Sequence, residues 1–134
     1  MEINLKGMWA QRDGPQLVRD LLRKSGLPSE SVRASLPDGW SKTKKIAVTV
    51  TGGGTPDARR AVTGENVEVR VHGADKAQVR KLLTQIDAFL TTPMAVGWVY
   101  QIRPASGVLV MPDSQLGGYV GLAVYKITTS RGIS

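Results

Sequence analysis

The chain has 134 residues, of which 41% are hydrophobic and 22% charged, so it can bury one core without a disulfide or a metal ion. Its 18 Lys and Arg against 11 Asp and Glu give a formal charge of +7, which suits either a polyanionic partner or a solvated basic face. The absence of cysteine excludes disulfides, thiolate metal sites and cysteine nucleophiles. We expect a single domain over residues 1–134.

The N-terminal part predicts an arm followed by a helix. Residues 1–14 are mixed in character and are expected to form a short strand or an arm. They lack the apolar run of a signal peptide, and no stretch approaches the length of a membrane span, so we expect no membrane association and a cytoplasmic origin. Pro15 then opens a pattern with an apolar face, and Gly26 ends it, which predicts a helix over 15–25.

The middle of the chain predicts two strands joined by a long loop. A turn-rich stretch over 28–41 precedes a basic cluster and a β-branched strand over 46–51. The glycine run that begins at Gly52 breaks this strand, and we expect a flexible loop over 52–64. A strand over 66–72 follows, in which valines alternate with polar residues. This pair is typical of a hairpin with an extended tip.

The remainder predicts a second helix and further strands. Apolar residues at helical spacing predict a helix over 75–90 with Asp75 as its N-cap. Shorter strands are expected over 98–103 and 107–111, then a long strand over 119–128. Both faces of this last strand are apolar, so we expect it to be central and covered on both sides. The predicted fold is α+β: an antiparallel sheet of about four strands, two helices packed on one face, and a long hairpin loop.

Groups for catalysis are scarce. The one histidine, His72, ends a strand on its polar face, where a surface histidine is the simplest interpretation. Gly52–Thr55 lacks the Lys-Ser/Thr pair and the helix that a phosphate loop requires, so a hinge is the better interpretation. We predict that the protein is not an enzyme and has no catalytic, cofactor-binding or metal site.

The candidate partner-contact residues are basic. Most of them flank the hairpin, at its base and in its loop, and Arg70 lies on the polar side of the second strand. Such charges suit contact with phosphate or with an acidic protein, but the aromatic residues that would stack on bases are missing between them. The candidates are Lys42, Lys44, Lys45, Arg59, Arg60 and Arg70.

Three segments carry a resemblance to a known family. They are the run from Val48 to Arg60, the strand from Val67 to Gly73, and the helix pattern Ala77-x-Val79-x-x-Leu82-Leu83. In these segments and in the order of its elements, most of the chain resembles the tail terminator proteins of long-tailed, siphovirus-type bacteriophages. The family diverges widely, and element order and size identify it better than any motif.

The resemblance implies a structural virion protein. Such proteins form a hexameric ring that caps the tail tube and joins it to head-completion or connector proteins, while genomic DNA passes through the channel without sequence-specific binding. It implies assembly in the host cytoplasm, a place in the virion tail, and a contact role for the loop over 52–64. We expect the basic residues of this loop to contact protein first and DNA second. Two alternatives remain: another head–tail connector or tail-completion protein, or a basic nucleic-acid-binding module.

Overall fold

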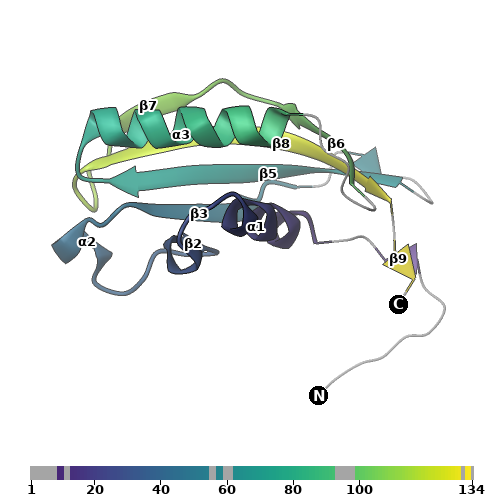
Figure 1. Cartoon of the computed structure of the whole chain (residues 1–134), viewed down its shortest axis with the longest axis horizontal. Helices are drawn as coiled ribbons and strands as arrows, with labels where there is room; N and C mark the ends of the chain where they lie inside the picture. The colour runs from purple at the N-terminus through teal and green to yellow at the C-terminus, as the bar shows by residue number, and fades with distance from the viewer. Residues whose placement is uncertain are drawn as a thin grey trace, which may run out of the picture.

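The computed structural model shows a mixed α and β chain built on one large sheet (Figure 1). It describes residues 9–10, 13–54, 57–58, 62–92, 99–130 and 132–133, and side chains within 13–54, 64–92 and 101–129. The elements in chain order are β1 (Trp9–Ala10), α1 (Gly14–Lys24), a 3-10 turn (Ser29–Ser31), β2 (Val32–Arg33), α2 (Trp40–Thr43), β3 (Ala47–Gly52), β4 (Asp57–Ala58), β5 (Val62–Gly73), α3 (Lys76–Thr91), β6 (Val99–Pro104), β7 (Leu109–Pro112), β8 (Tyr119–Ser130) and β9 (Gly132–Ile133).

Helix α1 lies within one residue of its predicted bounds. Two carboxylates, one on each side of its first turn in sequence, accept hydrogen bonds from the amides at its start. The Asp13 side chain accepts a hydrogen bond from the Gln16 amide at 3.0 Å, while Glu65 of β5 accepts one from the Gly14 amide at 3.1 Å. Both carboxylates satisfy amides that the first helical turn leaves unpaired and oppose the positive end of the helix dipole. Glu65 therefore ties α1 to the sheet.

In the described part of the chain the main sheet has seven strands, where about four were expected. Its central path runs β2-β3-β5-β8-β6, with β4 paired to β5 and β7 paired to β8. All pairs in it are antiparallel except β2 with β3, which is parallel and therefore departs from the predicted antiparallel sheet. The extra strands β2 and β4 have only two residues each, which is too short to leave an alternating pattern in the sequence.

The hairpin loop expected over 52–64 is shorter than predicted. β5 begins at Val62, and its first residues pair with β4 and β8. Past the end of β3, the Gly53 amide donates to the Asn66 carbonyl at 2.6 Å and the Asn66 amide donates to the Gly54 carbonyl at 2.7 Å. Backbone pairing thus continues beyond the point where the glycines suggested a break. Residues 55–56 and 59–61 lie outside the described residues.

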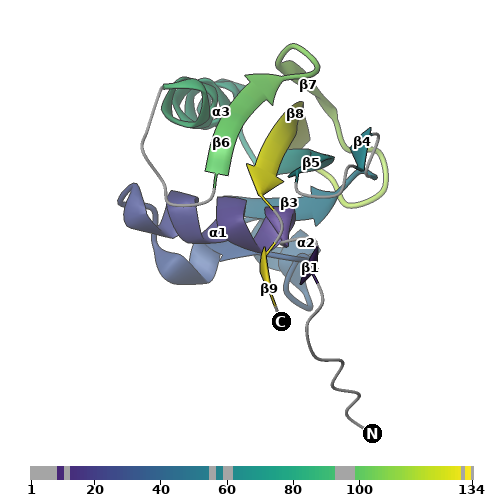
Figure 2. The same ribbon diagram turned by 90° about the vertical axis from the view of Figure 1, so that its right-hand side faces the viewer.

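Helices α1 and α3 pack on the same face of the sheet, as predicted (Figure 2). The alternate valines of β5, Val67, Val69 and Val71, are fully buried on this face. Tyr125 of β8 is buried beside them and donates a hydrogen bond to the Asp87 carboxylate of α3 at 2.6 Å. Burial and this carboxylate raise the pKa of Tyr125, so its hydroxyl keeps its proton and joins helix to strand.

The opposite face of β8 corrects the expectation of a strand covered on both sides. β8 is central, because β5 pairs with one of its edges and β6 and β7 pair with the other. Ala123, Tyr125 and Ile127 point to the helices and are buried, whereas the residues between them are only half-buried. No helix of the described chain lies over Leu122 and Val124. The apolar pattern of β8 therefore exceeds what the described residues cover.

Candidate assembly surface

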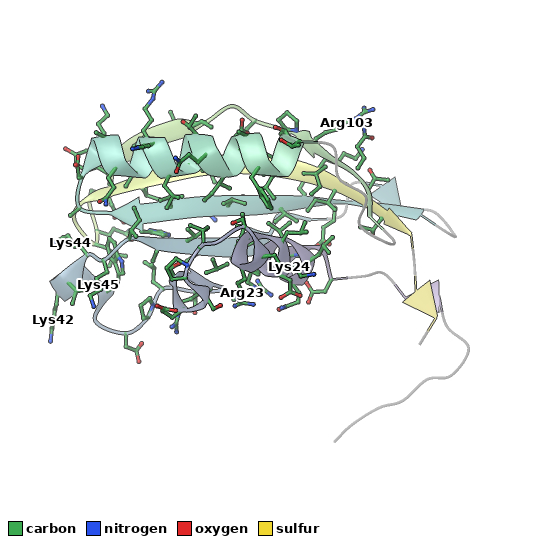
Figure 3. The ribbon with its side chains drawn as sticks, viewed as in Figure 1. Arg23, Lys24, Lys42, Lys44, Lys45 and Arg103 are labelled. Atoms are coloured by element: carbon green, nitrogen blue, oxygen red, sulfur yellow. The ribbon has the colours of Figure 1, made fainter. Side chains whose placement is uncertain are left out.

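Three of the predicted basic residues, Lys42, Lys44 and Lys45, are brought together at one end of the sheet (Figure 3). The cause is Trp40, which is 4% exposed and donates its indole N–H to the Lys45 carbonyl at 2.6 Å. The Lys44 amide donates a hydrogen bond to the Trp40 carbonyl at 2.7 Å, and Lys44 takes a left-handed conformation with φ of 49°. The tryptophan thus closes a tight turn that presents the three lysines just before β3.

The Lys44 side chain packs against the loop between β7 and β8. A Cβ atom added to Gly117 of that loop would lie 2.7 Å from Lys44 Cε. Asp113 fixes the loop, since its carboxylate accepts hydrogen bonds from the amides of Gln115 and Leu116, each at 3.0 Å. The basic turn and the β7–β8 loop therefore form one end of the molecule.

Arg70 does not point freely toward a partner. Its guanidinium forms an ion pair with Glu68 at 3.0 Å and donates to the Thr51 hydroxyl at 3.4 Å, both on the sheet face that α1 and α3 leave open. Both side chains of the pair are about one-third exposed (34% and 31%), so water weakens their attraction. Arg70 is a half-buried member of this face rather than part of the lysine cluster.

The two remaining candidates, Arg59 and Arg60, lie outside the described residues. Their neighbours Ala58 and Val62 belong to the hairpin end opposite the lysine turn, since β5 runs from Val62 to Gly73, a length of roughly 35 Å. The described structure therefore brings together Lys42, Lys44 and Lys45 but does not place the hairpin tip beside them.

His72 is not the surface histidine that the sequence suggested. It is 7% exposed, because the Trp40 ring packs edge-on against it with the ring centroids 5.7 Å apart. Its Nε2 lies 3.1 Å from the Thr49 hydroxyl, and its Nδ1 is buried without a hydrogen-bond partner in the described residues. Burial lowers the pKa of His72; the Asp113 charge raises it and the Arg70 charge lowers it further.

The surface that sequence reasoning missed is apolar. The large hydrophobic side chains exposed in the described part of the chain gather on β7 and the segments around it: Val108 at 37%, Leu109 at 54%, Met111 at 38% and Leu116 at 39%. Leu109 lies opposite Leu122 of β8, and Met111 lies opposite Val120, on the open face of the sheet. We call Leu109, Met111, Val120 and Leu122, which share this face, the β7 patch.

The two edges of the sheet are protected differently. At β2, Arg23 donates to the Val32 carbonyl at 2.9 Å and Arg33 donates to the Ser35 carbonyl at 3.1 Å, so charged side chains occupy that edge. At β7, the chain carries no charge from Gly107 to Pro112. Charged residues commonly prevent edge strands from pairing with other chains, and β7 lacks them.

A second apolar surface lies on the helical side of the molecule. A groove of about 400 Å³ separates the C-terminal end of α1 from α3. We call it the α1–α3 groove, and its lining residues are Leu22, Ser25, Gly26, Leu27, Leu82, Gln85, Ile86 and Phe89. Leu27, Leu82 and Phe89 are only half-buried, so the groove exposes apolar side chains in the described structure.

Within the described residues, no group of three or more His, Asp or Glu side chains is arranged to hold a metal ion. In the same part of the chain, no helix is both long and apolar enough to cross a membrane. No protein-family model matches the sequence, and comparison with curated proteins finds no match.

Proposed function

We propose that this protein is a structural assembly protein that builds a ring from copies of itself, in the manner of a phage tail terminator. The observation that carries the proposal is the β7 patch, an uncharged edge strand with exposed leucine and methionine side chains beside a sheet face that the described residues leave half-buried. Exposed apolar side chains that adjoin, as Leu109 with Leu122 and Met111 with Val120 do, mark protein interfaces, and an edge strand without charged residues favours them.

The charge distribution supports the same proposal. Lys42, Lys44 and Lys45 lie beside the β7–β8 loop, so the basic end and the apolar patch adjoin. A ring whose subunits meet through apolar contacts leaves such lysines at its rim, where they are available to an acidic partner or to DNA in transit. The partners we propose are the tail tube protein and a head-completion or connector protein, in the virion tail.

A nucleic-acid-binding module is the second candidate, and the lysine turn is the observation that favours it. Three lysines within four residues form a compact positive site. The turn lacks an exposed aromatic side chain for stacking, because Trp40 is buried under the sheet end. The assembly proposal accounts for both the β7 patch and the lysine turn, whereas the nucleic-acid-binding proposal accounts for the lysine turn alone.

The assembly proposal predicts a closed oligomer in solution. Light scattering on the purified chain should give a mass near six times the 14.4 kDa of one copy, and negative-stain images should show rings. Added to polymerising tail tube subunits of the same virion, the protein should stop their elongation. A monomer at every concentration, with no effect on tube length, would contradict the proposal.

A further inference from the structure

His72 lies where the lysine turn, residues 40–45, meets the sheet. It belongs to β5, an interior strand, and pairs with Ala47 of β3 on one side and with Val120 of β8 on the other, so its backbone is held from both sides. Its imidazole is 7% exposed, and Nδ1 has no hydrogen-bond partner among the described residues. Because the strand is fixed, water reaches this ring only when a group that covers it moves away.

The group that covers His72 and belongs to a weakly held element is Trp40. The centroids of the two rings lie 5.7 Å apart, and Trp40 is itself 4% exposed. Trp40 begins α2, which has four residues, no side-chain cap at its start, and a left-handed residue on each flank, Gly39 and Lys44. A helix this short has little stability of its own, so its contact with the sheet holds it in place. The packing of Trp40 on His72 therefore attaches the lysine turn to β5.

The charged groups around His72 do not compensate for an imidazolium. Asp113 of the β7–β8 loop favours the charged ring, whereas Arg70 of the same strand opposes it, and burial, the largest influence, lowers the pKa of His72. The neighbours on β3 and β8, Thr49 and Val120, carry no charge. The lysine turn adds only further positive charge, on Lys42, Lys44 and Lys45. The closed arrangement therefore favours the neutral ring.

We infer that protonation of His72 in mild acid releases Trp40 from the sheet, so that the lysine turn opens while α1, α3 and the strands stay folded. A charged imidazole has to be hydrated, and the turn above it moves because β5 is held on both sides. The closed turn binds the proton less readily than the open turn, so a falling pH favours the open form and a rising pH closes it again. The arrangement of the three lysines then depends on pH in each single copy, whether or not copies form a ring.

The indole N–H of Trp40 reports the state of the turn, since in the closed turn it donates to the Lys45 carbonyl at 2.6 Å. The chain has a single histidine, so a transition between about pH 5 and pH 7 points to His72. The experiment is hydrogen exchange followed by NMR, with the indole signal assigned through Trp40→Phe. Its protection from exchange should fall at least about tenfold from about pH 7.5 to about pH 5, while the backbone amides of β5 keep theirs.

Two variants should move this transition in opposite directions. Asp113→Asn removes the charge that raises the pKa of His72 but keeps a side-chain oxygen to accept the loop amides, so the turn should open at a lower pH. Arg70→Gln removes a charge that lowers this pKa, so the turn should open at a higher pH. A merely structural role of these residues would not shift the midpoint with opposite signs.

The matched control is His72→Phe, which keeps a ring beneath Trp40 but has no group to protonate. Its indole N–H should stay protected across the whole pH range, and His72→Gln, which is also neutral, gives the same check if the larger ring disturbs the fold. An indole N–H of the parent chain that remains protected at about pH 5 overturns the inference. So does the same acid transition in the two His72 variants, or a simultaneous loss of protection in β5, which would show that the whole fold opens rather than the turn.

Discussion

His72 owes its environment to three side chains that are distant from it in sequence. Trp40 covers its ring, Thr49 lies within hydrogen-bond distance of Nε2, and Asp113 lies close enough to raise its pKa. The largest effect is nevertheless burial, which lowers the pKa because a charged imidazolium would lose its water. The neutral ring is therefore the form that the folded chain favours.

Stability should fall in mild acid because of this residue. The folded-state pKa of His72 lies below its ordinary value of 6.5, so the unfolded chain binds the proton more readily. The contribution is complete above about pH 6.5 and is lost as the pH falls through the folded-state pKa, at no more than about 1.4 kcal/mol per pH unit. Urea unfolding between about pH 8 and pH 5 should show a shallower loss for His72→Gln than for the parent chain. Parallel curves would contradict this account.

At the scale of elements, the β7–β8 loop is the connection that joins the basic turn to the β7 patch. The Asp113 amide donates to the Gly118 carbonyl and the Gly117 amide donates to the Asp113 carbonyl, each at 3.0 Å. Gly117 and Gly118 have φ values of 79° and 71°, which side chains other than glycine rarely adopt. The loop conformation depends on these glycines, and through it so does the position of Leu116.

Gly118→Ala should destabilise the fold by about 1–3 kcal/mol. Its backbone is left-handed, and a Cβ atom there would collide with the Gly73 carbonyl, which belongs to the backbone of β5 and cannot move aside. The control is Gly107→Ala, since a Cβ atom at that glycine of the neighbouring loop meets nothing within 4 Å. Thermal unfolding should show Gly107→Ala within about 0.5 kcal/mol of the parent. Equal losses for the two variants would contradict the argument.

At the scale of the whole molecule, charge and apolar surface act in opposite directions on assembly. Each copy carries a formal charge of +7, so copies repel one another at low ionic strength. The proposed contact is apolar, so salt screens the repulsion between copies without weakening the contact. Binding to DNA responds in the reverse way, because its affinity falls as salt competes for the phosphates.

Raising the salt concentration from about 50 mM to about 500 mM should therefore increase the oligomer fraction seen by sedimentation, while it abolishes duplex DNA binding in the same buffers. Lys42→Glu with Lys45→Glu should weaken DNA binding at low salt and leave the oligomer intact. Loss of the oligomer at high salt would instead favour an interface held by ion pairs.

The sequence alone determined the elements in which apolar residues recur at helical or alternating spacing. The helical spacing of apolar residues placed α1 and α3 within one residue of their bounds, and the alternating valines of β5 identified its buried face. Local patterns suffice in these elements, because a helix or strand of several turns or pleats repeats its contact with the core. The packing of two helices on one face followed from the same patterns.

Only the tertiary structure decided what covers each surface. Alternation shows which residues of β8 share a face, but whether Leu122 is covered depends on helices elsewhere in the chain. His72 is buried by Trp40, 32 positions earlier, and two-residue strands such as β2 leave no pattern to detect. The candidate site changed for the same reason: the lysine turn was evident as a charge cluster, whereas the β7 patch became evident once the open face of the sheet was known. Burial is a property of the whole arrangement, so a sequence window contains the apolar residues but not the surfaces they meet.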